Sequence, residues 1–250
     1  KAIEIIDNDS SKNYNQNNTL SNTAKNLLYE SISSSNIVLE KYPDSKYVDD
    51  AIYYMGRSYF SLYEFYKAKK FFSQLIDQSP NSQHYNEARI WLEYSNLKLN
   101  ILDSVLTNTL IIQNELESSN KKKDKKLFFL LHNLKGDFFV EFKDFDKAFL
   151  EFEIALSFIN TKSKKTMMYS KLAHISEAEQ QFEKAANYLE KIQLFSNNND
   201  TQVEAFRNWL IVMKKLKKYD DIILKIEENI NLSSFESEKL QDEFNMELAI

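Results

Sequence analysis

The chain has 250 residues, with 37 acidic and 32 basic side chains and a formal net charge of −5. It contains two glycines, two prolines and no cysteine, whereas average usage in soluble proteins is about 7% glycine and 5% proline. These counts exclude a many-stranded β fold and a glycine-rich phosphate loop, and they exclude disulfides, thiolate metal sites and cysteine nucleophiles. Because 43% of the residues are hydrophobic and 28% are charged, the composition favours an all-α protein.

Apolar positions at helical spacing predict twelve helices in chain order. A short stub at 2–6 and a polar loop or disordered segment at 8–21 precede them, and the last helix belongs to a partial repeat or capping helix at 234–250. The predicted ranges are 22–42, 46–62, 65–78, 83–99, 101–116, 127–142, 145–158, 164–180, 182–195, 201–217, 219–230 and 234–249.

A period of 37 residues underlies these helices. Pro43 and Pro80 are 80 − 43 = 37 residues apart, and each stands eight residues before an alanine. The spacing from Gly56 to Phe65 is nine residues, and the same spacing separates Gly136 from Phe145. Equivalent second-helix positions at 148, 185 and 222 are again 37 apart. The register slips by six residues between the second and third units, where a basic run at 118–126 predicts an insertion.

The segment from Asp49 to Ser82 resembles the tetratricopeptide repeat. That family places a bulky residue, Leu-Gly and Tyr on the first helix of each pair, then small and aromatic residues on the second helix, then Pro. The corresponding residues here are Ile52, Met55, Gly56, Tyr59, Ala68, Phe72, Leu75 and Pro80. The resemblance implies a single right-handed superhelical solenoid of antiparallel helix pairs over residues 1–250.

The small residues predict how each pair packs. Gly56 and Gly136 are expected where two helices cross most closely, with Ala68 and Ala148 opposite them. The rings of Phe72 and its later equivalents are then expected to fill the adjacent layer.

Tetratricopeptide superhelices bind partners in a concave groove lined by the first helix of each pair. Carried over by position, the resemblance predicts a partner-binding groove in the first three units at Asp50, Tyr53, Arg57, Phe60, Glu87, Ile90, Tyr94, Leu97, Asn133 and Asp137. It continues the groove through Val140, Ser170, His174, Glu177, Arg207, Ile211 and Lys214.

The sequence offers no catalytic constellation. His84, His132 and His174 are separated by 48 and 42 residues, which gives no metal-binding pair on one helix face. We therefore expect no metal, no cofactor and no enzymatic activity. The net negative charge and the presence of only three arginines also argue against a nucleic-acid ligand.

The tandem Pro-x-Ser linkers look like those of bacterial cell-envelope tetratricopeptide proteins of the BamD and YbgF types. That resemblance implies a periplasmic, outer-membrane-associated scaffold with a protein or peptide partner, and a lipid anchor upstream of Lys1 would attach it to the membrane. Two alternatives stay open at this point. One is a cytosolic adaptor that binds peptides, and the other is the helical segment of a larger enzyme.

Overall fold

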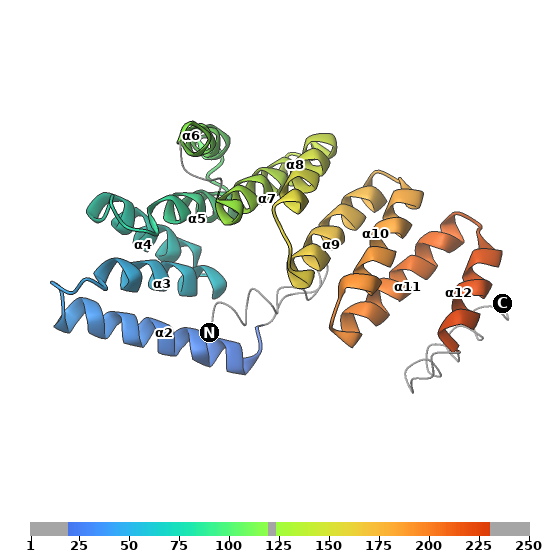
Figure 1. Ribbon diagram of the computed structural model, residues 1–250, viewed down its shortest axis with the longest axis horizontal. Helices are drawn as coiled ribbons and strands as arrows, with labels where there is room; N and C mark the ends of the chain where they lie inside the picture. Colours follow the sequence, from blue (N-terminus) through green and yellow to red (C-terminus); the bar gives the residue numbers. More distant parts are fainter. Residues whose placement is uncertain (1–19, 120–123, 231–250) are drawn as a thin grey trace.

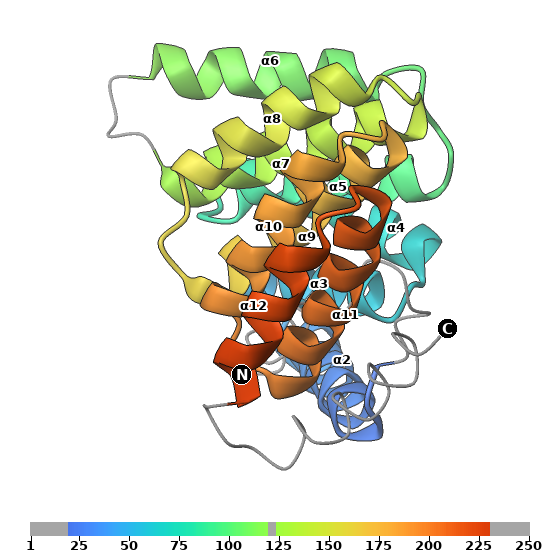
Figure 2. The same ribbon diagram turned by 90° about the vertical axis from the view of Figure 1, so that its right-hand side faces the viewer.

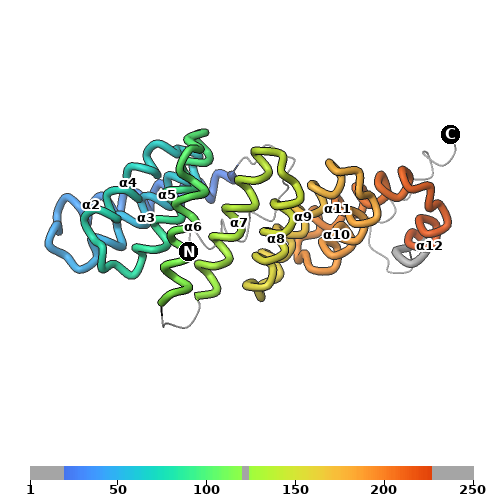
Figure 3. The backbone as a smooth tube through the Cα atoms, turned by 90° about the horizontal axis from the view of Figure 1, so that it is seen from above, coloured from blue at the N-terminus to red at the C-terminus, as the bar shows by residue number. Residues whose placement is uncertain are grey.

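The computed structural model describes residues 20–119 and 124–230, and within them the chain forms helices joined by short connections, without a strand (Figure 1). The helices follow one another along an arc from α2 to α12, and most consecutive helices run antiparallel, with α6 as the exception (Figures 1 and 3). The predicted all-α solenoid of helix pairs is confirmed. The helices are α2 (Asn22–Lys41), α3 (Val48–Ser61), α4 (Phe65–Gln78), α5 (Tyr85–Lys98), α6 (Val105–Ser118), α7 (Lys125–Glu141), α8 (Phe145–Ser157), α9 (Lys162–Ala178), α10 (Phe182–Phe195), α11 (Asn199–Lys215) and α12 (Tyr219–Ile230).

Each predicted helix from 22–42 to 219–230 lies within four residues of an observed one at both ends. The predictions for residues 2–6, for most of 8–21 and for 234–250 lie outside the described residues, and so does the middle of the basic run. Ser21 is described, and its hydroxyl caps α2 by accepting a hydrogen bond of 3.2 Å from the Ala24 backbone N–H. Among the described helices, none is both long and apolar enough to span a bilayer.

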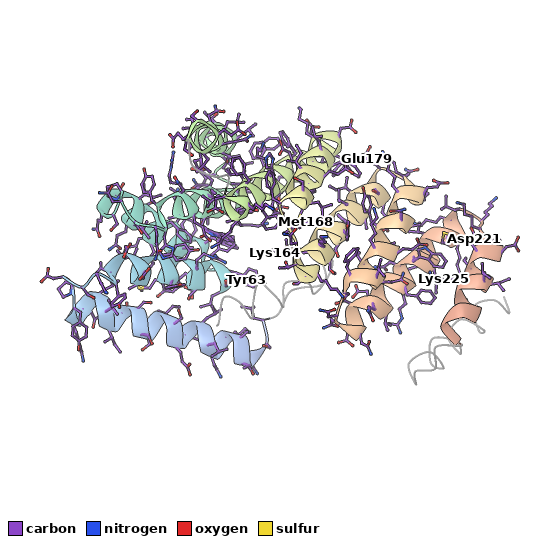
Figure 4. The ribbon with its side chains drawn as sticks, in the orientation of Figure 1. Tyr63, Lys164, Met168, Glu179, Asp221 and Lys225 are labelled. Atoms are coloured by element: carbon purple, nitrogen blue, oxygen red, sulfur yellow. The ribbon has the colours of Figure 1, made fainter. Side chains whose placement is uncertain are left out.

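The backbone itself repeats with the predicted period. Each of five helix pairs turns at one residue in the left-handed conformation, with φ between 56° and 61°. In every turn this residue donates its N–H to the carbonyl three residues earlier, and the next residue donates to the carbonyl five residues earlier. The intervals are 37, 43, 37 and 37 residues, so the six extra residues fall in the interval that holds the basic run. The turn residues are Tyr63 (labelled in Figure 4), Asn100, Lys143, Gln180 and Lys217.

The two glycines make room for phenylalanine rings, not for alanines as predicted. A Cβ atom placed on Gly56 would lie 2.6 Å from the Phe72 ring, and one on Gly136 would lie 2.2 Å from the Phe152 ring. Both rings are fully buried. In both pairs, α3 with α4 and α7 with α8, a phenylalanine ring of the second helix packs directly against the glycine of the first helix.

The second pair departs from this arrangement. Glu93 stands where Gly56 would recur (56 + 37), and Thr109 stands where Phe72 would recur (72 + 37). Glu93 is buried and accepts hydrogen bonds from the amides of Asn96 (3.1 Å) and Asn108 (2.9 Å), and burial raises the pKa of its carboxyl group. In this pair a hydrogen-bonded carboxylate thus replaces the contact between glycine and ring, α6 lies across the outside of the arc, and α5 also packs on α7 (Figures 1 and 2).

Candidate partner-binding surface

The first helices of the five pairs follow one another and form the inner surface of the solenoid. Helix α3 contacts α5, and α5 contacts α7. Lys171 of α9 binds two side chains of α7, and a pocket lies between α9 and α11. This is the surface on which the sequence predicts a partner groove.

Glu87 of α5 is the centre of the junction between α3, α5 and α7. Its Oε1 accepts hydrogen bonds from the Tyr53 hydroxyl, from Arg57 Nη1 at 3.3 Å and from Trp91 Nε1 at 3.3 Å. Its Oε2 accepts one of 2.6 Å from Lys126 Nζ at the start of α7. The Arg57 guanidinium also stacks on the Trp91 ring, 3.9 Å from its centroid. Three successive first helices are therefore joined by one buried carboxylate.

The charge state of Glu87 follows from these contacts. Burial alone would raise the pKa of the carboxyl group, but hydrogen bonds from Lys126 and Tyr53 and the charges of Lys126 and Arg57 outweigh it and hold the pKa below its ordinary value. Burial raises the pKa of the Tyr53 hydroxyl, which therefore stays protonated and donates. Glu87 is therefore an ionised carboxylate that is buried in the protein and accepts hydrogen bonds on both of its oxygens.

A second set of polar contacts continues from α5 through α7 to α9. The Asn133 amide donates to the Tyr94 hydroxyl, which lies 3.5 Å from the Leu130 carbonyl oxygen. On the other side, Lys171 Nζ donates to Asn133 Oδ1 at 2.7 Å and to Asp137 Oδ1. Lys171 is buried, and burial lowers its pKa although Asp137 opposes that shift.

Most of the ten predicted groove residues are buried between helices and are not exposed on the inner surface. Only three of them, Asp50, Phe60 and Asp137, keep partial exposure. Asp50 Oδ1 lies 2.8 Å from His84 Nε2, and Phe60 packs edge-on against the ring of Trp91. A partner-binding role for the ten stays a prediction. The seven that are buried are Tyr53, Arg57, Glu87, Ile90, Tyr94, Leu97 and Asn133.

The inner surface opens between α9 and α11. At the register of Tyr53, Ile90 and Asn133 the fourth unit carries Ser170 (133 + 37), whose short side chain turns back to the Thr166 carbonyl oxygen at 3.0 Å. A pocket lies beside it, with a floor from α10. The lining residues are Ser170, Ala173, His174, Glu177, Leu189, Ile192, Thr201, Glu204, Ala205 and Asn208. The sequence pattern had pointed to three of them, Ser170, His174 and Glu177.

Glu177 is the unusual residue of this pocket. Its register positions in earlier units carry Phe60, Leu97 and Val140, so a carboxylate replaces an apolar side chain. Burial raises the pKa of Glu177, and only the more distant charges of Lys215 and His174 oppose the shift. Within the described ranges, the carboxylate makes no hydrogen bond or ion pair.

Within residues 20–119 and 124–230, no group of three or more His, Asp or Glu side chains is placed to hold a metal ion. His84 is stacked on Tyr53, with centroids 4.1 Å apart. His132 Nδ1 lies 2.6 Å from Glu151 Oε2. Both histidines are therefore engaged in packing between helices.

The fold and its inner surface define a helical-repeat protein. A comparison with known protein families identifies one of its repeat units. Residues 50–82 match the family model described as a tetratricopeptide repeat. This segment covers α3 and α4, with Gly56 seated on Phe72. No curated protein sequence matches the chain.

Among solved structures, the chain is similar to a chain in the crystal structure of the APC/C hetero-tetramer Cut9-Hcn1. The identity is 18% and the TM-score is 0.41. The match covers 86% of this chain and 45% of the other, so this chain spans less than half of the length of that protein.

Proposed function

We propose that the chain is a protein-interaction scaffold that holds a segment of a partner protein against its inner surface. In this proposal, the α3–α5–α7 part is a rigid support and the α9–α11 part makes the contact. We propose no catalytic role. The proposal is supported by the change at one register position, from the buried Tyr53, Ile90 and Asn133 to Ser170, which accompanies a pocket on the inner surface.

The proposed location is the bacterial cell envelope, on the resemblance of the Pro-x-Ser linkers at Pro43 and Pro80. The first thirty residues of the full-length precursor test it. A signal sequence that ends in a lipid-acceptor cysteine supports an anchored periplasmic scaffold, and a plain cytosolic start contradicts it.

Site-specific cross-linking tests the interaction surface, because residues 1–250 contain no cysteine that would compete with an introduced one. A Ser170→Cys variant coupled to benzophenone maleimide probes the pocket, and Leu150→Cys on α8, which is 57% exposed, is the matched control. We expect a discrete adduct from position 170 and none of the same mass from position 150 when both are illuminated in cells of the source organism. The same adduct from both positions, or from 150 alone, would contradict the proposal.

A further inference from the structure

The pocket between α9 and α11 has polar groups that the rest of the fold does not use. Thr201 lines the pocket with 4% of the residue exposed, and its hydroxyl makes no hydrogen bond within the described ranges. The side chain of Asn208 is likewise without one in the described ranges, and it lines the same pocket. Both side chains are therefore available to a ligand that enters the pocket.

The position of Glu177 is not explained by helix stability. It lies in the last turn of α9 (Lys162–Ala178), where a negative charge is unfavourable for the helix dipole. It also replaces the apolar residue of three earlier units, and its half-buried carboxylate has no ion-pair partner among the described residues. Lys215 is close enough to affect its charge, but its ammonium lies over the Phe182 ring, 5.0 Å from the centroid.

The remaining lining separates into an apolar floor and a polar rim. Ala173, Leu189, Ile192 and Ala205 supply the floor from three helices, and all four are buried. A lysine side chain combines an aliphatic stem with an ammonium group that donates three hydrogen bonds. The Glu177 carboxylate, the Thr201 hydroxyl and the Asn208 amide oxygen are three acceptors on the walls of the same pocket.

We infer that the α9–α11 pocket binds a lysine side chain of the partner, with its stem on the apolar floor and its ammonium at Glu177. This inference rests on the proposed function and names the chemistry of the partner at that site. A lysine whose charge has been removed by acetylation would lose the ion pair and would no longer fit the three acceptors.

The probe is a pool of fluorescent decapeptides with lysine fixed at the centre, compared with a matched pool that carries Nε-acetyl-lysine there. Anisotropy gives the dissociation constants, and amide NMR shifts at Ser170, Glu177 and Thr201 locate the site. We expect the lysine pool to bind at least about tenfold more tightly than the acetylated pool, because the contact is a charge-assisted hydrogen bond.

Three variants keep this test decisive. Glu177→Gln should weaken binding of the lysine pool by about tenfold, and Thr201→Val should weaken it by a smaller factor, since a neutral hydrogen bond is worth less. Glu141→Gln removes the same charge from the exposed end of α7 and should leave binding unchanged. Circular dichroism of each variant confirms that it is folded.

Equal affinity for the two pools, or unchanged affinity in Glu177→Gln, would overturn the lysine pocket. If no pool binds while the adduct at position 170 persists in cells, the pocket inference fails and the interaction surface stands. If the adduct is also absent, the proposed function fails with it.

Discussion

The two halves of the inner surface share one backbone period but differ in the side chains at their junctions. Between α3, α5 and α7, long polar side chains such as Tyr53 and Tyr94 reach the next first helix and close the surface. Between α9 and α11, Ser170 is too short to do so, and a pocket remains. The repeat therefore determines where inner-surface residues point, whereas the length of each side chain determines whether it joins two helices or leaves a pocket between them.

The carboxylates of Glu87 and Glu177 show the same contrast in charge. Both lie on first helices at the inner surface. Glu87 is buried and accepts hydrogen bonds from four side chains, whereas the half-buried Glu177 carboxylate accepts none within the described ranges. We interpret the first as part of the structure and the second as part of a binding site.

The largest expected difference between the halves is in stability. Glu87→Ala should lower the free energy of unfolding by about 3–5 kcal/mol, because it leaves the buried Arg57 guanidinium without its counterion. Glu177→Ala should change it by less than about 0.5 kcal/mol, since no described contact is lost. Urea unfolding followed by circular dichroism measures both. Equal losses in the two variants would mean that Glu177 is also structural.

A smaller difference is expected for single hydrogen bonds. Tyr94→Phe removes the acceptor of the buried Asn133 amide and should cost about 1–3 kcal/mol. Ser170→Ala removes only a bond to its own helix and should cost less than about 0.5 kcal/mol. The same unfolding assay compares them, and a cost for Ser170→Ala as large as that of Tyr94→Phe would remove the distinction between closed and open junctions.

The two carboxylates should also respond to pH with opposite signs. The ordinary pKa of Glu is about 4.3. Because the folded-state pKa of Glu87 is lowered, its stabilising contribution is present above pH ~4.3 and is lost as the pH falls through the folded value. Because the folded-state pKa of Glu177 is raised, ionisation opposes folding, and stability falls as the pH rises from ~4.3 through the folded value.

Unfolding free energies of wild type, Glu87→Gln and Glu177→Gln between pH 3 and pH 7 separate these contributions. We expect Glu87→Gln to flatten the acid limb of the profile. We expect Glu177→Gln to remove a decline above pH ~4.3 that amounts to a fraction of a kcal/mol, since the group is half exposed. Shifts of the same sign in the two variants would contradict the assigned environments.

The smallest expected effect is that of glycine substitutions in the turns between paired helices. It should be the same in both halves, because the turns have the same backbone conformation. Lys143 and Lys217 adopt the left-handed conformation without being glycine. Lys143→Gly and Lys217→Gly should each stabilise the protein by about 0.5–1 kcal/mol, as glycine adopts this conformation without strain. Thermal unfolding measures the gain, and a loss in either variant would show that the lysine side chain contributes something beyond the turn.

Much of the fold could be predicted from spacing, because helix periods and the recurrence of glycine, alanine and proline are local properties of the chain. The side chains that fill the space where two helices cross could not be predicted in this way. Spacing placed Gly56 at a crossing, but it gave no information that the Phe72 ring fills that space or that a buried Glu93 would link α5 to α6 through Asn108.

The repeat register predicted which positions lie on the inner side of their helices, but it did not predict which of those side chains are exposed. Periodicity places Tyr53, Glu87 and Ser170 on the same side of their helices, yet whether a side chain spans the gap depends on the residue opposite it in the next unit. A signal was present in the sequence. Long polar residues such as Tyr53 and Glu87, 34 positions apart, could have been examined as pairs across a junction.

The most direct measurement of the difference between the halves is the reactivity of a single introduced thiol. Ile90 and Ser170 occupy the same register position, Ile90 is fully buried, and the chain has no cysteine of its own. We expect Ser170→Cys to react with a thiol reagent close to the rate of a free cysteine under native conditions, and Ile90→Cys to react only when the protein unfolds. Equal rates at the two positions would contradict it.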